Sequence, residues 1–386
     1  MKLLIIPSWY PTKIHPESGT FFKNRAHIIN GLGINIIIAS PILHSFSDIL
    51  NYKNISENIY SSDSDIPIYI KEKINFFPKL EKLQFRSYKN NAIILFNYVI
   101  HEIGKPDIIL FNSSIWAATA LFQQCKKLNI PYIITEHLKE FLSHNSFSKF
   151  QKHLLNNCYD SSSAIVATST KLKNSIAESF PDHQTKIHLI PNPIDEDIFI
   201  QKKQKKHSQI KIVCIALLRR EKRLDILIKA FKKIIQKKYH AQLTLIGSGP
   251  LESELKQLTR NLNLENYIEF TGFLTTNRLI HELHKHDFLT LSSELETFGM
   301  AIIEAQSCGL PVVATDCGGP SDLITKETGI LVKPNSVKNL ETGLIKMIHN
   351  LDLYNSDIIR EQTITKFGKI KYRESILQLI SSLLNL

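Results

Sequence analysis

The stretch ELETFGMAIIE, residues 294–304, decides how this chain is interpreted. The helix-forming run Met300–Gln306 follows the helix-breaking sequence Thr297–Phe298–Gly299, so a helix is predicted to begin near Gly299. The first backbone N–H groups of a helix lack partners within the helix and lie at the positive end of its dipole. These groups are therefore predicted to bind phosphate or sugar oxygens.

Two glutamates flank this helix start. Glu296 lies just before it, and Glu304 lies on the predicted helix, roughly 12 Å away if the whole span were helical. A nucleotide-sugar has about that length. The alternative, that both are solvated surface charges, is the usual situation for glutamate and stays open for Glu304 at this point. The strand Pro311–Thr315 and the turn Gly318–Gly319 downstream favour a ligand site.

Composition limits the protein class. A chain of 386 residues fits two domains, and 43% hydrophobic with 22% charged residues is ordinary for a folded protein. No apolar run is long enough to span a bilayer, and residues 1–7 read as a first strand rather than a signal sequence. The five cysteines are scattered without metal or disulfide spacing, which indicates a reducing cytoplasm. The net charge of +11 is spread over both halves, which argues against a nucleic-acid-binding arm.

Short β-branched runs alternate with helical patterns along the whole chain. Two successive series of this kind predict an α/β fold of two doubly wound, Rossmann-like domains. We expect the domains to span residues 1–193 and 207–365, with a last helix in 366–386 that crosses back to the first domain. Ligands of such sheets bind beyond the carboxyl ends of the strands. The cleft between two facing domains is the expected site.

Residues 71–89 mix basic and aromatic side chains. Such a segment can dock on an anionic membrane surface. The alternative is a solvated helix whose aromatic side lies in the core. The residues concerned are Lys71, Lys73, Lys79, Lys82, Arg86 and Lys89 with Phe76, Phe77, Phe85 and Tyr88.

Further candidates follow predicted strands at the carboxyl end. His137 comes after Tyr132–Thr135, where a neutral imidazole could hydrogen-bond a sugar hydroxyl or a developing charge. Arg219, Arg220, Lys222 and Arg223 come after Ile212–Ala216, where cations suit a diphosphate. The alternatives are a surface histidine and a solvated basic turn.

Two other motifs are weak. Gly247–Ser248–Gly249–Pro250 resembles a dinucleotide-binding turn, but Glu252 replaces the third glycine, so we interpret it as a tight strand-to-helix turn. Asp63–Ser64–Asp65 and Asp195–Glu196–Asp197 do not end apolar strands, where metal carboxylates of nucleotide-sugar enzymes usually lie. We therefore predict no metal site.

The motifs together resemble the retaining glycosyltransferases of family 4, which have the GT-B fold. In the C-terminal half the resemblance rests on the Glu296–Glu304 motif, Gly309–Ala314, Gly318–Gly319, Pro191–Asp195 and Glu221–Lys222. In the N-terminal half it rests on Trp9–Pro11, Pro16–Phe22 and Thr135–His137.

The resemblance implies a role for each site residue. Glu304 would hold the ribose hydroxyls and Lys222 the diphosphate. Glu296 would contact the donor sugar, and His137 would line that sugar near the reacting carbon. Backbone N–H groups of Phe298, Gly299 and Met300 would bind sugar and phosphate oxygens, and Gly19 would let the first loop approach the phosphates.

One position departs from the family pattern. The family's Gly–Arg–Leu turn corresponds here to Ala216–Leu217–Leu218, so a leucine replaces the usual arginine. Arg219 or Arg220 could supply the missing charge, or Lys222 and helix dipoles could hold the diphosphate alone. Loss of one charge-assisted contact costs about 1.5–3 kcal/mol.

The expected activity is metal-independent transfer of a sugar, with retention, from a nucleoside diphosphate sugar to an acceptor hydroxyl. The acceptor would be a glycan or lipid-linked molecule of cell-surface polysaccharide or glycolipid synthesis, and the nucleotide-sugar would be a co-substrate with no other cofactor. A catalytically silent nucleotide-sugar binder and a nucleotide-sugar epimerase of the same fold are the alternatives.

Overall fold

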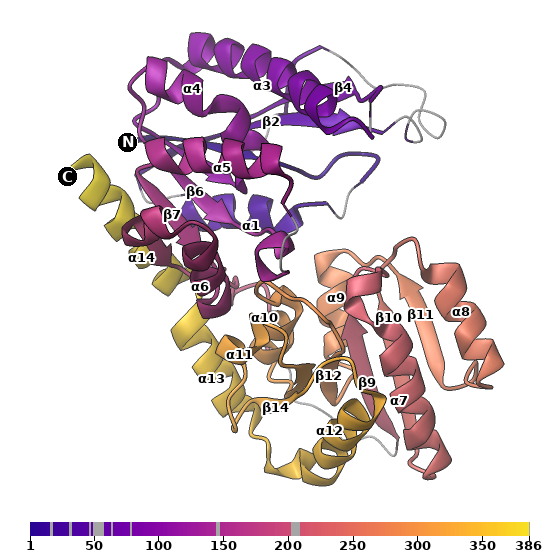
Figure 1. Ribbon diagram of the computed structural model, residues 1–386. Helices are drawn as coiled ribbons and strands as arrows, with labels where there is room; N and C mark the ends of the chain where they lie inside the picture. The colour runs from indigo at the N-terminus through magenta and orange to yellow at the C-terminus, as the bar shows by residue number, and fades with distance from the viewer. Residues whose placement is uncertain are drawn as a thin grey trace. The chain divides into compact units, whose positions relative to one another are not determined.

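The computed structural model describes residues 1–15, 18–30, 33–45, 48, 58–62, 65–77, 79–143, 147–201 and 209–385. The loop residues Pro16 and Glu17 and the acidic motif at Asp63–Ser64 lie outside this set. The chain forms two compact units, Met1–Ile190 with Arg373–Leu386, and Pro191–Tyr372. Each is a parallel sheet with helices, as the alternating pattern predicts (Figure 1).

The sheet of the first unit has eight strands in the order β3-β4-β2-β1-β5-β6-β7-β8. Among the described strands, β3 alone is antiparallel, to β4, and the others run parallel. The central strands β5, β6 and β7 are buried along their whole length, which explains their continuous apolar sequences. The strands are β1 (Lys2–Pro7), β2 (Asn35–His44), β3 (Tyr60–Ser62), β4 (Ile68–Ile74), β5 (Ile108–Asn112), β6 (Tyr132–Glu136), β7 (Ala164–Ala167) and β8 (Ile187–Leu189).

Helices α3, α4 and α5 of this unit lie side by side in one layer (Figure 1). The last helix returns to the first unit, where Arg373 Nε donates to the carbonyl of Ile28 on α1 at 2.5 Å. The helices are α1 (Thr20–Ile29), α3 (Glu81–Ile103), α4 (Thr119–Lys127), α5 (Lys149–Ser161), α6 (Thr170–Ser179) and α14 (Lys369–Leu384), with short helical turns at Ser114–Ala118, Lys139–Leu142 and Pro181–Lys186.

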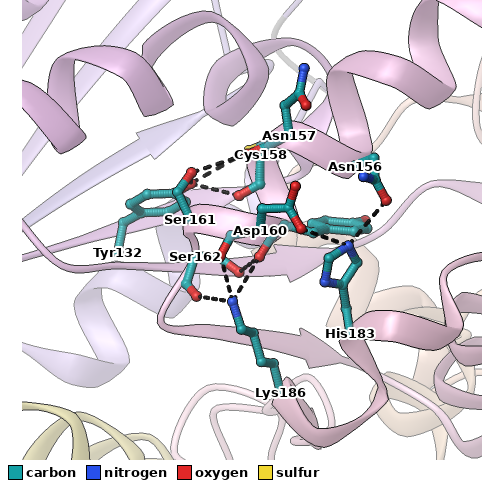
Figure 2. A network of polar contacts seen from close by, with 10 residues as sticks. Tyr132, Asn156, Asn157, Cys158, Asp160, Ser161, Ser162, His183 and Lys186 are labelled. Atoms are coloured by element: carbon teal, nitrogen blue, oxygen red, sulfur yellow. Dashed lines mark hydrogen bonds and ion pairs between the residues drawn. The ribbon is translucent and has the colours of Figure 1, made fainter.

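Lys186 closes the C-terminal end of α5. Its ammonium donates to the carbonyl oxygens of Tyr159, Asp160 and Ser162 at 3.1, 2.7 and 3.0 Å (Figure 2). The Tyr132 hydroxyl donates to the carbonyl of Cys158 at 2.6 Å in the same network. The Ser162 N–H also donates to the Tyr159 carbonyl at 3.2 Å, so the cluster supplies donors to carbonyl groups at the end of the helix and stabilises the fold.

The basic and aromatic segment 71–89 divides between several elements. Lys71 and Lys73 lie on β4, whereas Phe85 and Tyr88 lie on α3 and are buried in the core. For these two aromatics the helix with an aromatic core side is the correct interpretation. Phe76 and Phe77, between β4 and α3, are 60% and 46% exposed.

The second unit has a six-stranded parallel sheet in the order β11-β10-β9-β12-β13-β14. This is the order of dinucleotide-binding sheets, and its direction reverses between β9 and β12. The strands are β9 (Ile210–Ile215), β10 (Ala241–Ile246), β11 (Ile268–Gly272), β12 (Phe288–Leu291), β13 (Val312–Thr315) and β14 (Gly329–Val332). The helices are α7 (Leu224–Gln236), α8 (Glu252–Asn261), α9 (Thr276–Leu283), α10 (Met300–Ser307), α11 (Pro320–Leu323), α12 (Val337–Asn350) and α13 (Ser356–Phe367), with turns at Arg220–Lys222 and Leu351–Leu353.

The two ends of the second unit are tied together. Ile194 N donates to the carbonyl of Phe367 at 2.8 Å, and Ile194 forms a parallel bridge with Gly368. Lys369 Nζ contacts Asp195 at 3.1 Å and also pairs with Asp197. The observed boundaries therefore differ from 193 and 365, because this pairing keeps residues 191–193 and 366–372 with the second unit.

No described helix is both long and apolar enough to cross a bilayer.

Candidate functional site

Three predicted site residues of the second unit come from segments that follow its strands β9 and β12. Lys222 follows β9, Glu296 follows β12, and Glu304 lies on α10, which connects β12 to β13. The sheet order changes direction between β9 and β12. Ligands of open α/β sheets bind at such a position, beyond the carboxyl ends of the strands.

Lys222 and Glu296 form an ion pair between Nζ and Oε2, and both side chains are about four-fifths buried. Burial lowers the pKa of Lys222, but the Glu296 carboxylate raises it more, so the ammonium stays charged. The Lys222 backbone is held by the residue that follows β12, since Ser292 Oγ donates to its carbonyl at 2.8 Å. The sequence assigned separate roles to the two residues and did not predict that they contact each other.

The loop that carries Glu296 is fixed by the neighbouring glycine turn. Gly319 N donates to the carbonyl of Glu296 at 2.7 Å, and Glu296 N donates to that of Cys317 at 3.4 Å. A Cβ atom on Gly319 would lie 2.2 Å from the carbonyl oxygen of Phe298. Only glycine allows this approach, so the Gly318–Gly319 motif positions the glutamate loop.

Helix α10 begins at Met300, directly after Gly299, as predicted. Gly299 has φ +111°, a conformation that side chains rarely adopt. Among the described residues, no acceptor bonds the backbone N–H groups of Phe298, Gly299 and Met300. The Phe298 ring is buried and packs against Phe367 with centroids 5.9 Å apart, so this residue can offer only its backbone to a ligand.

Glu304 is half-buried on α10. Within the described ranges its carboxylate has no hydrogen-bond or ionic partner, and burial raises its pKa to about 7. Solvated surface glutamates do not have such a pKa. The role of Glu304 as a ligand of the ribose hydroxyls stays a prediction.

The turn at residues 216–220 packs against the Gly247–Pro250 turn. Leu218 N donates to the carbonyl of Ser248 at 2.9 Å, and a Cβ on Gly249 would lie 2.6 Å from Leu218 O. The glycines therefore allow the two turns to pack closely. This agrees with the interpretation of Gly247–Pro250 as a tight strand-to-helix turn. Leu217 is 38% exposed.

Arg219 and Arg220 are both exposed, and neither guanidinium has a side-chain partner in the part of the chain that the structure covers. Whether either replaces the family's arginine stays a prediction.

In the first unit, His137 follows β6 at its carboxyl end, as predicted. Arg25 Nη1 lies 3.0 Å from His137 Nε2, and Arg25 Nη2 donates to Thr135 Oγ1 at 3.2 Å. Burial, followed by the Arg25 charge, lowers the pKa of His137 well below its ordinary value. Sequence analysis missed Arg25; its position three residues after Phe22 and four before Ile29, on the apolar face of the helix, was the available signal.

Gly19 is the residue before α1 and has φ +71°. A Cβ there would lie 2.9 Å from the carbonyl oxygen of Trp9. This contact within the first loop accounts for the glycine. Its predicted approach to phosphates stays a prediction.

The acidic motif Asp195–Glu196–Asp197 belongs to the network that joins the ends of the second unit. Asp195 and Asp197 pair with Lys369, and Glu196 accepts from Lys369 N at 2.9 Å. No group of three or more possible metal ligands occurs in the described portion of the chain.

The sequence matches two family models of known proteins. Residues 195–362 match the family model of glycosyl transferases group 1, and residues 60–198 match that of glycosyltransferase family 4. The chain belongs to the family 4 glycosyltransferases.

Named relatives of this glycosyltransferase agree with that assignment. A human phosphatidylinositol N-acetylglucosaminyltransferase chain is 28% identical over 62% of this chain and 49% of its own length. The N-acetyl-alpha-D-glucosaminyl L-malate synthase of Bacillus anthracis is 27% identical over 51% of this chain and 53% of its own. The matches span about half the length of both relatives.

The fold is that of GT-B glycosyltransferases. The structure of Anabaena HepE in complex with UDP and glucose superposes with a TM-score of 0.74, covering 99% of this glycosyltransferase and 100% of that chain. The two sequences are 19% identical, so the likeness concerns the fold.

Proposed function

We propose that this glycosyltransferase moves a sugar from a nucleoside diphosphate sugar to an acceptor hydroxyl, with retention at the anomeric carbon and without a metal ion. One observation carries the proposal. Lys222, Glu296, Glu304 and the N–H groups of Phe298–Met300 gather where the sheet order of the second unit reverses. They match the anionic diphosphate and the hydroxyl groups of such a donor.

Each group has a chemical role in this proposal. The Glu304 carboxylate accepts from the ribose hydroxyls, and Lys222 with the start of α10 neutralises the diphosphate. Glu296 and His137 hold the sugar. The bond between the anomeric carbon and the diphosphate oxygen breaks, and its electron pair leaves with the diphosphate. The acceptor oxygen forms the new bond and loses its proton. The residues act by positioning and electrostatic stabilisation.

The names of similar proteins support the substrate classes. UDP and glucose are named in the HepE structure, which supports a nucleotide-sugar donor. Phosphatidylinositol in the name of the human relative supports a lipid-linked acceptor. We infer a role in the synthesis of glycolipids or cell-surface polysaccharides at the cytoplasmic face of a membrane.

A nucleotide screen tests the donor site. The melting temperature is measured with UDP, GDP, ADP and CMP, since a ligand at 100 times its dissociation constant stabilises a protein by about 2.7 kcal/mol. We expect one nucleoside diphosphate to stabilise the wild type but not Glu304→Gln. If none of the four does so, the donor assignment is wrong.

Product analysis with the matching nucleotide-sugar separates the alternative activities. Transfer to an added glycolipid acceptor, with the anomeric configuration kept, supports the proposal. Donor binding without transfer indicates a silent binder. A changed sugar still attached to the nucleotide indicates an epimerase.

A specific observation also favours membrane contact. Phe76, Phe77 and Leu80 are 60%, 46% and 55% exposed, and the basic residues Lys79 and Lys82 are exposed beside them in the sequence. Exposed aromatics flanked by cations suit an anionic bilayer surface, where each basic residue contributes about 1 kcal/mol. We propose that this segment brings the enzyme to lipid-linked acceptors.

A further inference from the structure

His137 is held on two sides by helix α1. The rings of Phe21 and Phe22 lie 5.2 and 5.1 Å from the imidazole, at interplanar angles of 60° and 71°. Arg25, one turn further along α1, is 3% exposed and reaches His137 Nε2 at 3.0 Å. Three residues of one helix thus fix the ring.

The Arg25 contact determines which ring nitrogen carries the proton. A guanidinium can only donate hydrogen bonds, so His137 Nε2 must accept, and an accepting Nε2 carries no proton. In a neutral imidazole the proton then lies on Nδ1. Protonation of Nε2 would place two donors and two positive charges against each other.

The second nitrogen of the guanidinium is anchored independently of His137. Arg25 Nη2 donates to Thr135 Oγ1 at 3.2 Å, and Thr135 is buried on β6. The neighbouring acid, Glu136, is committed elsewhere, because the Tyr159 hydroxyl donates to it at 2.6 Å. The charged group that faces the imidazole from α1 is therefore Arg25, and β6 contributes the neutral Thr135.

We propose that Arg25 is a positioning residue: it holds His137 as a neutral imidazole whose Nδ1–H is the donating group of the ring. His137 then acts as a hydrogen-bond donor and never as a proton carrier at Nε2. The catalytic part of this inference rests on the proposed transferase function, whereas the tautomer does not. The lowered pKa of His137 agrees with a ring that stays neutral at physiological pH.

Nitrogen NMR of the histidine-labelled full chain tests the tautomer directly. We expect His137 to show the Nδ1–H form and to stay neutral through the pH range in which free histidine titrates. His286 is an internal standard, because its Nδ1 donates to the Glu282 carbonyl at 2.7 Å in a separate buried site. An Nε2–H form, or ordinary titration, of His137 in the wild type overturns the proposal without any activity measurement.

Substitution tests the link to turnover. Arg25→Met should let His137 titrate nearer its ordinary pKa and lower kcat about tenfold, the effect of one charge-assisted hydrogen bond. The signal of His286 and the affinity for the nucleoside diphosphate should not change. Lysine also can only donate hydrogen bonds, so Arg25→Lys should keep the Nδ1–H form of His137 that Arg25→Met loses.

A double-mutant cycle separates positioning from a general structural effect. In a His137→Ala background, Arg25→Met should cause little further loss of kcat. An equal loss in both backgrounds would show that Arg25 does not act through His137. If no nucleotide-sugar supports transfer while the tautomer is as expected, the proposed function fails and the tautomer assignment stands.

Discussion

Lys222 and Glu296 lie 74 residues apart in the sequence and form an ion pair in the loops after β9 and β12. The pair joins the residue assigned to the diphosphate to the residue assigned to the sugar. A diphosphate that binds Lys222 competes with Glu296 for the same ammonium. The two side chains are therefore coupled, and their substitutions should have opposite effects on nucleotide binding.

Lys222→Met should weaken binding of the nucleoside diphosphate about 10- to 100-fold, because a hydrogen bond to a charged group contributes about 1.5–3 kcal/mol. Glu296→Gln removes the competing carboxylate, so this affinity should stay equal or rise while sugar transfer falls. Calorimetry and initial rates measure the two effects. Lys229→Met, which breaks an exposed pair with Asp225, is the matched control and should change neither. If Lys222→Met and Glu296→Gln weaken nucleotide binding equally, the two residues do not have the separate roles assigned to them.

Glu304 should make nucleotide binding depend on pH. Its pKa is raised from 4.5 to about 7 by burial. In the proposed donor complex the ribose hydroxyls donate to the ionised carboxylate. Affinity should therefore rise as the pH rises through about 7. Calorimetry on either side of this pH should show the rise for the wild type and not for Glu304→Gln.

The same raised pKa of Glu304 should make the folded protein less stable as the pH rises, whereas nucleotide affinity increases. Between pH 4.5 and about 7 the folded protein retains a proton that the unfolded chain has lost. The contribution of Glu304 to stability is thus complete below pH 4.5 and lost as the pH rises to about 7. Denaturant titrations at several pH values across this window should show that the free energy of unfolding depends less on pH in Glu304→Gln than in the wild type. The same pH dependence in both proteins would contradict the burial of the carboxyl group.

Gly319→Ala should displace the loop of Glu296 and Phe298, because the added Cβ would lie 2.2 Å from Phe298 O. Overpacking of this kind costs about 1–3 kcal/mol. We expect a lower melting temperature together with loss of nucleotide binding. Gly104→Ala is the control, since its Cβ meets only the end of the Lys2 side chain at 3.5 Å, while its φ of +74° strains the backbone within the first unit. The control should keep nucleotide binding, and retained binding in both variants would argue against the positioning role of Gly319.

Replacement of Phe76 and Phe77 by serine should reduce sedimentation with vesicles that contain anionic phospholipid. Both rings are largely exposed, so the melting temperature should change little. Leu353→Ser tests an exposed apolar residue of the second unit, which is 80% exposed, and should leave sedimentation unchanged. Unaltered vesicle binding of the phenylalanine variant would rule out this segment as the docking surface.

Much of the fold could be predicted because its strands are short, apolar and buried on both sides. The predicted strands Tyr132–Thr135 and Pro311–Thr315 each differ by one residue from the observed β6 and β13. Strands β3, β4 and β8 were missed: β4 alternates buried and partly buried residues and contains charges, and β3 and β8 are only three residues long. None of them has the pattern of a continuous apolar run.

The candidate site could be predicted where one local motif defines it. The helix start at Gly299 follows from its own sequence. The Lys222–Glu296 pair and the Arg25–His137 contact could not be predicted, because the partners are 74 and 112 residues apart and only the sheet order brings them together. Spacing along a chain carries no information on such pairs.

The pairing of Ile194 with Gly368 bears on how this enzyme can be engineered and how its relatives can diverge. Because the chain enters and leaves the second unit through adjacent, hydrogen-bonded segments, residues 191–372 form a cassette inserted between the first unit and its last helix. The two ends of this cassette lie side by side, so its exchange for that of another family member requires a structural match at one location only. If the donor binds the second unit as proposed, the choice of donor can change by recombination while the remainder of the enzyme keeps its own sequence.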